Sequence, residues 1–399
     1  MFLSDLDKEI AVLKKMGRYR FLRPLSTAQD AVITINGRQL VNFASNNYLG
    51  LANHPEIVAA FTAAAARYGV GAGASRLICG HMDIHAQLEE ALARLKGTEA
   101  CLTFSSGYLA NLGILATLGG PRATVFSDEL NHSSIIDGCR LSRSRVEIYR
   151  HADADRLEAL LKTSKAPRKI IVTDSVFSMD GDIAPLPDLV ALRDRYGAVL
   201  VVDDAHAVGV LPPRGCGSAE YFNLPPEAID VQMGTLSKAL GTYGAYICAS
   251  KKTVDYFINT CRTFIYNTGL PPALAGAAIK AVEMLSAGTD LLRRLWENRE
   301  SFIAEMAARG RPVESPSAIM PLITGGDRET MVVSAALYER GLFVHGIRPP
   351  SVPQGMGRLR LTLMATHTTE MVRTAAACVD ELFGEEGLKA IGKKRYKKS

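Results

Sequence analysis

The sequence predicts an α/β protein with a large, mostly parallel α/β domain and a smaller C-terminal α/β domain. Two observations support this prediction. From about residue 55, short β-rich runs alternate with helix-period segments, which is typical of parallel strands joined by helices. A second, shorter series of strands and helices follows residue 286. We therefore expect an N-terminal arm and hairpin over 1–54, a large domain over 55–285 and a C-terminal domain over 286–399.

The elements follow in order along the chain. A charged helix-like start precedes a turn at Pro24 and an alternating run over 32–37 that is typical of a hairpin. Apolar residues recur at helical spacing from Ile84 to Leu95, and Gly97 ends that helix. We expect the strands of the large domain at 101–104, 123–127, 169–173, 198–203, 231–235 and 244–249.

The C-terminal part begins after Pro271-Pro272, where we expect one long helix that continues through Arg294. Strands are expected at 342–345 and 358–363, and Thr368 or Thr369 opens the last helix.

The charge distribution argues against a nucleic-acid-binding protein. Lysine and arginine number 46 against 41 acidic residues, and five of the basic residues lie in the last seven positions. The rest of the chain is therefore neutral, so a generally basic surface is excluded. The basic tail is interpreted as a solvated end.

The cysteines and the apolar segments predict a cytoplasmic protein outside the membrane. Seven scattered cysteines without a CxxC pair indicate a reducing compartment. The N-terminus lacks the apolar core of a signal peptide. The longest uncharged stretch, 100–121, contains polar residues, four glycines and a proline, which suits a strand, a loop and a buried helix.

Two motifs suggest a ligand site that their sequence context does not support. The run Gly69 to Ala74 satisfies G-x-G-x-x-A, but a helical stretch precedes it where a dinucleotide site needs a strand. His81 and His85 have the spacing of metal ligands on a helix, yet they fall at a helix start, where capping or a loop contact is expected. We therefore expect no metal site.

Four other segments together suit one cofactor. A serine–glycine turn over 105–108 joins a strand to a helix and can bind a phosphate. A strand ends in Asp203, where open α/β sheets bind ligands. Lys238 lies among small residues and hydroxyls, as a Schiff-base lysine does. His132 follows another strand and can stack on a planar ring. These are the groups that pyridoxal phosphate requires.

With these motifs, the chain resembles the α-oxoamine synthases, pyridoxal-phosphate enzymes of the aspartate-aminotransferase-like fold (PLP fold type I). The resemblance extends from about Arg20 to the last helix. The matching segments are Ser45–Gly50, Asn131–Ser134, Val176–Asp182, Asp203–His206, Gly234–Lys238 and Arg348–Arg360.

The resemblance implies a role for each matching residue. Lys238 forms the Schiff base, and Asp203 pairs with the pyridine nitrogen. His206 contacts the phenolic oxygen of the cofactor, and His132 stacks on its ring. The further cofactor-binding residues are Gly107, Tyr108, Ser178, Thr235 and, across the interface of a homodimer with shared active sites, Thr268. The substrate-binding residues are Arg20, Asn46, Arg348, Ser351 and Arg360, of which Arg360 holds the amino-acid carboxylate with the assistance of Arg348.

The activity implied is a decarboxylating condensation of an amino acid with an acyl thioester carried by coenzyme A or an acyl carrier protein. The segment 346–353 is most similar to the biotin-pathway branch, which joins L-alanine to a pimeloyl thioester. Arg20 falls where that branch holds a substrate, and Arg18 or Arg23 of the same basic run could serve instead. Ser351 departs from the usual Thr. Ala207-Val208 and 131–138 are similar to the glycine-using ligases, and Gly241-Thr242 to the serine palmitoyltransferases.

A different class stays open on the same fold, namely a partner subunit without catalytic activity. Such subunits typically lose the Schiff-base lysine. Lys238, Asp203, His132 and Arg360 are all present, which favours an active enzyme.

Overall fold

The computed structural model describes residues 2–288 and 290–383, which fold into two compact units. Unit 1 comprises Met1–Asn46, Met179–Gly181 and Arg294–Ser399, and unit 2 comprises Asn47–Ser178 and Asp182–Arg293. The N-terminal arm and hairpin thus belong with the C-terminal part of the chain. The predicted domain bounds stay a prediction, namely 1–54, 55–285 and 286–399.

A seven-stranded sheet forms the centre of unit 2, and its order is β3-β9-β8-β7-β6-β4-β5. Strand β9 is antiparallel to both β3 and β8, whereas β8, β7, β6, β4 and β5 run parallel to one another. The mostly parallel sheet is therefore confirmed. The strands are β3 (Ala100–Phe104), β4 (Ala123–Asp128), β5 (Arg145–Tyr149), β6 (Arg168–Asp174), β7 (Val199–Asp203), β8 (Val231–Thr235) and β9 (Ala245–Ala249).

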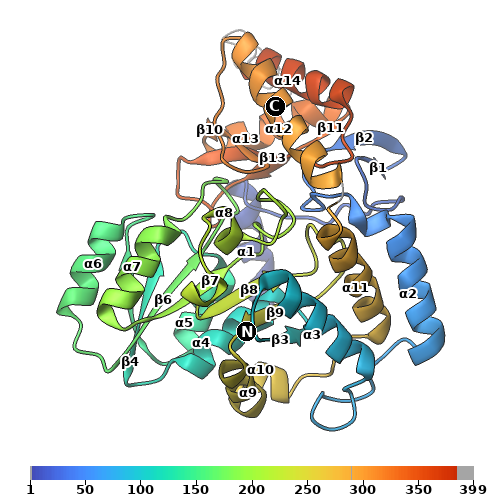
Figure 1. The fold of residues 1–399 in the computed structure, drawn as a ribbon. Helices are drawn as coiled ribbons and strands as arrows, with labels where there is room; N and C mark the ends of the chain where they lie inside the picture. Colours follow the sequence, from blue (N-terminus) through green and yellow to red (C-terminus); the bar gives the residue numbers. More distant parts are fainter. Residues whose placement is uncertain (1, 289, 384–399) are drawn as a thin grey trace. The chain divides into compact units, whose positions relative to one another are not determined.

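Helices cover both faces of this sheet (Figure 1). In β6, Ile170 and Val172 pack into one apolar cluster and Ile171 into the other, because successive side chains of a strand point to opposite faces. One face carries α4 (Gly107–Leu118), α5 (Ser133–Leu141), α9 (Lys251–Thr260) and α10 (Arg262–Ile265). The other carries α6 (Ala154–Thr163) and α7 (Leu186–Tyr196).

Three further helices of unit 2 pack together, with α11 (Pro272–Ser286) against α2 (Pro55–Tyr68) and α3 (Asp83–Lys96). The glycine-rich run 69–74 follows α2 rather than a strand, as expected. His85 accepts a hydrogen bond from the Met82 N–H at 3.0 Å, and its other ring nitrogen lies 2.6 Å from the Leu270 carbonyl oxygen. The capping interpretation of His85 is thus confirmed. The short helices are η1 (Leu51–Asn53), α8 (Ser218–Tyr221) and η2 (Pro226–Ala228).

Unit 1 contains two three-stranded sheets, ordered β1-β2-β11 and β10-β13-β12. The expected hairpin is present as β1 (Val32–Ile35) and β2 (Arg38–Asn42), which pair antiparallel. The other strands are β10 (Ile319–Gly325), β11 (Leu342–Phe343), β12 (His345–Ile347) and β13 (Gly357–Thr362). The helices are α1 (Phe2–Lys15), α12 (Asp290–Ala308), α13 (Asp327–Glu339) and α14 (Thr369–Phe383).

Two expectations about elements were wrong. The helix after Pro271-Pro272 does not continue through Arg294, since α11 ends at Ser286 and α12 begins at Asp290. Gly288 has φ +74°, a left-handed conformation that ends a helix. The single strand expected at 342–345 is instead the two strands β11 and β12, which belong to different sheets.

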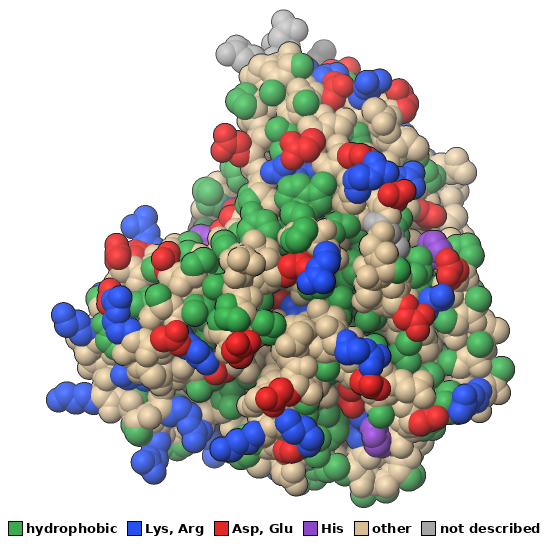
Figure 2. Space-filling view, in the orientation of Figure 1, with side chains coloured by type: hydrophobic (Ala, Val, Ile, Leu, Met, Phe, Trp, Pro, Cys, Tyr) green, Lys and Arg blue, Asp and Glu red, His purple; other side chains and the backbone are tan. Residues whose placement is uncertain are grey.

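The surface agrees with the nearly balanced composition. Acidic and basic side chains are interspersed over the visible face, without a continuous basic area there (Figure 2). Among residues 2–288 and 290–383, no helix is long and apolar enough to cross a membrane. The basic run at 393–399 lies outside the described residues.

Candidate active site

The predicted cofactor residues of unit 2 gather where its parallel strands end. Asp174 is the last residue of β6, Asp203 is the last residue of β7, and these two are register partners. Lys238 follows β8 by three residues. Parallel strands present their carboxyl ends at one edge of the sheet, which is where open α/β folds bind ligands. The sheet itself therefore brings these side chains to one edge.

A hydrogen-bonded chain links three of the side chains. Lys238 Nζ lies 2.8 Å from Nε2 of His206, and His206 Nδ1 lies 2.7 Å from the phenol oxygen of Tyr48. If the ammonium group donates to Nε2, the ring proton resides on Nδ1 and is donated to Tyr48. His206 is only 5% exposed, so this chain fixes its orientation.

Asp203 is held from two sides. The Asn111 side-chain amide donates to Oδ2 at 2.7 Å, and the Ala205 N–H donates to Oδ1 at 2.9 Å. Asn111 comes from α4 and also donates to Ser134 Oγ at 2.9 Å. Asp203 is 4% exposed. A buried carboxylate with both oxygens hydrogen-bonded is a rigid acceptor for a positively charged N–H group.

Asp174 differs from Asp203 although the two residues are neighbours. Burial, and then the nearby charge of Asp203, raise the pKa of Asp174 well above its usual range. Its Oδ2 accepts a hydrogen bond from the His132 N–H at 2.7 Å. Asp174 therefore holds its proton more tightly than an ordinary carboxyl group, and it anchors the start of α5.

His132 precedes α5 and caps it. Its Nδ1 lies 2.7 Å from Ser134 Oγ. Partial desolvation lowers the pKa of His132, Asp203 opposes this effect, and the charge of Lys238 lowers the pKa further. His132 thus shares its electrostatic environment with Asp203 and Lys238 while its side chain stays exposed, as a stacking ring requires. A neutral imidazole is the form favoured here.

Groups suited to a phosphate lie nearby in the sequence of unit 2. Gly107 and Tyr108 open α4, whose first N–H groups cannot be paired within the helix, and Ser106 Oγ caps it by accepting from the Leu109 N–H at 3.3 Å. Thr235 Oγ1 lies 2.7 Å from Ser237 Oγ. Ser178 lies in the turn after Val176, and Thr268 is exposed and pairs with Ser75 in an isolated bridge.

The predicted substrate residues belong to unit 1. Arg360 is 6% exposed and donates to Asn46 Oδ1 and to Thr362 Oγ1, both at 2.9 Å. Arg348 is 7% exposed and donates to the Tyr19 carbonyl oxygen at 3.2 Å. Burial, and then the charge of Arg20, lower the pKa of Arg348. The structure thus brings Arg360 together with Asn46, and Arg348 together with the arm that carries Arg20.

Ser351 lies in the turn after Arg348 and donates its backbone N–H to the Arg348 carbonyl oxygen at 3.2 Å. Its side chain is exposed.

Three residues around these groups had no predicted role: Tyr48, Asn111 and Asp174. Tyr48 lies inside Ser45–Gly50, one of the segments that match the α-oxoamine synthases, so this motif alone could have indicated Tyr48 as a site residue. Asp174 ends the strand next to that of Asp203, and neighbouring strand ends were the available signal. Asn111 follows Gly107 by one helical turn, but only the three-dimensional structure shows that it reaches Asp203.

This donor set fits pyridoxal phosphate. The group needs an amine for its aldehyde, an acid for its ring nitrogen, a flat neighbour for its ring and N–H or O–H donors for its phosphate. Unit 2 offers Lys238, Asp203 and His132 for the first three needs, and Gly107, Tyr108 and Thr235 for the last. The buried and doubly hydrogen-bonded carboxylate of Asp203 is the most telling observation, because such a group demands a cationic partner.

Comparison with known proteins identifies the family. The family model described as aminotransferase class I and II matches residues 38–379. The chain belongs to this family and, within it, to the pyridoxal-phosphate-dependent α-oxoamine synthases. It is therefore an enzyme of PLP fold type I that uses pyridoxal phosphate, and the interpretation as an inactive subunit is set aside.

Several curated relatives are similar over nearly their whole length. The chain is 49% identical to the 8-amino-7-oxononanoate synthase of Geobacter sulfurreducens over 384 residues, which cover 95% of this chain and 98% of the relative. It is 44% identical to the enzyme of that name from Thermoanaerobacter pseudethanolicus, with 95% and 98% coverage.

Solved structures show the same fold in two enzymes of the family. A serine palmitoyltransferase from S. paucimobilis with bound PLP–myriocin is 30% identical, with a TM-score of 0.90 and 97% of each chain covered. The 8-amino-7-oxononanoate synthase of Francisella tularensis is 27% identical, with a TM-score of 0.73, 86% of this chain and 97% of that chain covered.

Proposed function

We propose that this enzyme condenses L-alanine with a pimeloyl thioester to give 8-amino-7-oxononanoate, a step of biotin biosynthesis. A carbon–carbon bond forms between Cα of alanine and the thioester carbonyl carbon. The carbon–sulfur bond breaks and the thiol leaves. The α-carboxylate is lost as CO₂, and Cα takes up a proton in its place. The observation that supports this choice of substrates is the identity of 44–49% to full-length relatives of that name.

The cofactor residues are proposed as follows. Lys238 would hold pyridoxal phosphate through its ε-amino group, Asp203 would accept the N–H of the ring nitrogen, and His132 would lie on the ring face. His206 would contact the phenolic oxygen. When bound, the cofactor supplies an electron sink for the charge left when the amino acid loses its α-proton. The phosphate is assigned to Gly107, Tyr108, Ser178 and Thr235, with Thr268 from the other subunit.

The protein side chains move and orient the remaining groups. Lys238 accepts the α-proton of the amino acid once its amino group is released, because an ε-amine close to the reacting carbon is the natural general base. Asp203, fixed by Asn111 and Ala205, keeps the ring nitrogen protonated. The hydrogen-bonded chain from Tyr48 through His206 to Lys238 holds the α-proton near the lysine after Lys238 has accepted it.

Arginines are proposed to recognise the two carboxylates of the substrates. Arg360 binds the α-carboxylate of alanine, since a guanidinium fork fixes a carboxylate in two places and thereby orients the bonds that break. Arg348 assists, with Ser351 in the same turn. Arg20 binds the far carboxylate of the pimeloyl chain. The like charges of Arg20 and Arg348 disfavour each other, and an anion beside them relieves that repulsion.

We further infer that the enzyme is a cytoplasmic homodimer that shares its active sites between subunits. All seven cysteines are free, as in a reducing compartment. Symmetric dimers are the commonest soluble oligomers. The thiol carrier is taken to be coenzyme A or an acyl carrier protein, and both forms of the substrate belong in the assay.

Product analysis across a matrix of substrates tests the proposal. L-alanine, glycine and L-serine are each combined with pimeloyl, acetyl and palmitoyl thioesters, and the products are identified by mass. We expect the alanine and pimeloyl pair to give the highest kcat/KM. The serine and palmitoyl arm is included because a serine palmitoyltransferase has the TM-score of 0.90. Faster condensation of glycine with acetyl-CoA would overturn the proposal.

The Arg20→Ala variant tests the far carboxylate. Loss of one charge-assisted hydrogen bond costs about 1.5–3 kcal/mol, so KM for the pimeloyl thioester should rise roughly tenfold or more while KM for alanine hardly changes. Arg23→Ala is the matched control, since Arg23 lies over the Phe21 and Tyr338 rings of the same unit. Equal effects in the two variants would remove the proposed role of Arg20.

A further inference from the structure

A buried ion pair adjoins the segment Asp203–His206, which is proposed to bind the cofactor in unit 2. Lys96 Nζ donates to Asp204 Oδ2 at 2.6 Å, and the two side chains are 1% and 0% exposed. Asp204 follows Asp203 in the chain, whereas Lys96 is the last residue of α3. A buried pair of this kind is costly to desolvate and is kept only where its geometry is well satisfied.

Asp204 is also the hydrogen-bonding centre of the turn that leads from Asp203 to His206. Its N–H donates to the Met233 carbonyl oxygen of β8 at 2.8 Å, and its own carbonyl oxygen accepts from the Ala207 and Val208 N–H groups at 2.9 and 3.1 Å. Its Oδ1 accepts from Ser218 Oγ at 2.5 Å. Any shift of Asp204 therefore shifts the backbone that carries Asp203 and His206.

The two adjacent carboxylates are directed to different surroundings. Asp203 bonds to Asn111 of α4, whereas Asp204 bonds to Lys96 of α3. Two buried negative charges on neighbouring residues repel each other. Lys96 neutralises the charge of Asp204. The charge of Asp203 is therefore left to pair with the positively charged ring nitrogen of the cofactor.

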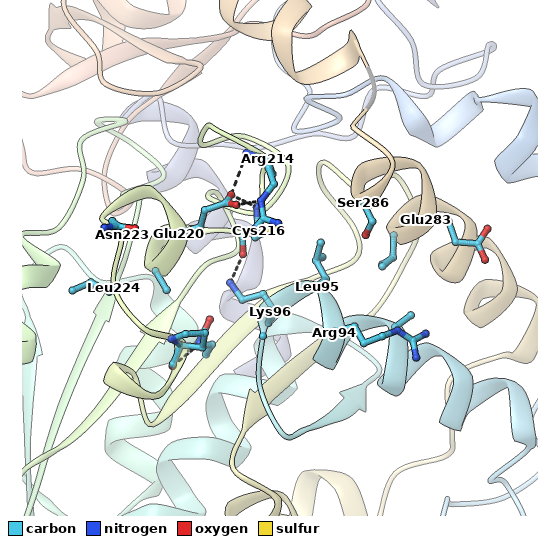
Figure 3. A pocket seen from close by; sticks show the side chains of 16 residues that line it. Arg94, Leu95, Lys96, Arg214, Cys216, Glu220, Asn223, Leu224, Glu283 and Ser286 are labelled. Carbon is cyan, nitrogen blue, oxygen red and sulfur yellow. Dashed lines mark hydrogen bonds and ion pairs between the residues drawn. The ribbon is translucent and has the colours of Figure 1, made fainter.

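The loop over 214–218 encloses this ion pair. Lys96 Nζ also donates to the Cys216 carbonyl oxygen at 2.6 Å, and Figure 3 shows Lys96 extending toward Cys216 while Arg94 of the same helix extends in another direction. Gly217 has φ +109°, and a Cβ there would lie 2.4 Å from both Asp204 Oδ2 and Lys96 Nζ. The loop can thus close over the pair only with glycine at this position.

We propose that Lys96 is a positioning residue for the cofactor site, which acts through Asp204 to fix the place and charge of the Asp203–His206 segment. The inference rests on the proposed roles of Asp203 and His206. It adds a requirement that none of those roles contains, namely a lysine on α3 whose ammonium never touches cofactor or substrate. Lys96 is also among the residues that line a pocket of about 580 Å³, whereas Lys238 is not.

A double-mutant cycle on the full-length enzyme tests this role, with pyridoxal phosphate alone as the probe. The variants are Lys96→Met, Asp204→Asn and the two combined. The readouts are the dissociation constant of the cofactor from the apo-enzyme, the pH at which the absorption of the bound cofactor changes, and the melting temperatures of apo- and holo-enzyme. Arg94→Met is the matched control, because Arg94 lies two residues before Lys96 in α3 and forms an exposed ion pair with Glu90.

In Lys96→Met we expect the cofactor dissociation constant to rise at least tenfold and the pH midpoint of the absorption change to move, while Arg94→Met stays at the wild-type values. In the Asp204→Asn background, Lys96→Met should cost far less, because no uncompensated carboxylate remains. Lys96→Arg should restore most of the affinity. A purely structural role would lower both melting temperatures equally and leave the dissociation constant and the pH midpoint unchanged.

Two outcomes would overturn the inference: wild-type cofactor affinity and pH midpoint in Lys96→Met, or the same loss from Lys96→Met in both backgrounds. If Lys96→Met alone does not fold, the comparison of Asp204→Asn with the double variant decides, and a further tenfold loss in the double variant contradicts the role. Asp203→Asn in the same series tests the underlying assignment. Wild-type absorption in Asp203→Asn would overturn the proposed function of Asp203 instead.

Discussion

At the scale of single residues, chemically similar side chains lie in different surroundings. Asp174 and Asp203 are register partners at the same sheet edge, yet burial next to Asp203 raises the pKa of Asp174. Asp203 accepts hydrogen bonds from Asn111 and Ala205, which hold its carboxyl group in place. The environment, rather than the residue type, separates an anchoring acid from a functional one.

The Arg360→Lys variant is predicted to lose affinity for the amino acid. An ammonium group cannot reproduce a bidentate fork, so KM for L-alanine should rise by roughly tenfold while KM for the acyl thioester changes little. Arg348→Lys should mainly lower kcat. Steady-state kinetics with each substrate varied in turn measures both effects, and equal changes of both KM values in Arg360→Lys would contradict the assignment.

His367 predicts a pH dependence of stability. Burial lowers its folded-state pKa to about 4, and its ring lies between the Met364 N–H and the Asn42 carbonyl oxygen of unit 1. The unfolded chain, with a pKa of about 6.5, binds more protons between these values, so stability is present above pH 6.5 and is lost as the pH falls toward 4. The loss is about 3 kcal/mol. Denaturant unfolding of His367→Gln should show a shallower pH slope, and an unchanged slope would contradict this.

At the scale of elements, helix α4 carries both the proposed phosphate-binding residues and the residue that supports Asp203 of the sheet. Ser106 caps its N-terminus, Gly107 and Tyr108 open its first turn, and Asn111 one turn later bonds to Asp203. The order of these residues along one helix places the proposed phosphate-binding residues and the support of Asp203 at a fixed spacing, because a helix rises about 1.5 Å per residue.

We predict that Ser106→Ala weakens both the helix and the cofactor site. Loss of an N-cap costs about 1 kcal/mol of stability. The first turn should then fray, and the dissociation constant of pyridoxal phosphate should rise several-fold. Ser250→Ala, which removes the comparable cap of α9, is the matched control and should lower the melting temperature without changing cofactor affinity. An unchanged affinity in Ser106→Ala would remove α4 from the phosphate site.

The sequence predicted the strands of the large sheet that have continuous apolar runs, and it missed β5 and β10. Strands β3, β4, β6, β7, β8 and β9 lie within a residue or two of expectation, because continuous apolar runs mark buried parallel strands. Strand β5 is an edge strand with mostly polar or exposed side chains. Strand β10, for which no strand was predicted, contains Pro321, and a proline is tolerated there because β10 is an edge strand of its sheet.

The candidate site was predictable to the same extent. Residues in quoted motifs, such as Lys238, His206 and Asp203, indeed lie together in unit 2. The contacts of Lys96 with Asp204 and of Asn111 with Asp203 join positions 108 and 92 residues apart. No local spacing encodes such pairs, since only the packing of α3 and α4 against the sheet brings them together.

At the scale of the whole molecule, the proposed homodimer predicts complementation between inactive variants. Lys238→Ala and Thr268→Glu enzymes should each be inactive, the second because a carboxylate repels the cofactor phosphate. If Thr268 serves the partner's site, each hybrid dimer contains one intact site, and an equal mixture should regain about a quarter of wild-type activity. Subunits are exchanged under mild denaturation, and hybrids are verified by a mass tag. Hybrids without activity would contradict the shared site.

The attachment of the cofactor to Lys238 is the claim on which the others depend, and one measurement tests it directly. The holo-enzyme is reduced with borohydride, digested and mapped by mass spectrometry, with the Lys238→Ala enzyme as the control. We predict that the reduced pyridoxyl group is found on Lys238, at high occupancy, and that the control carries none at comparable level. Modification of another lysine in the wild-type enzyme at high occupancy would contradict the proposed site.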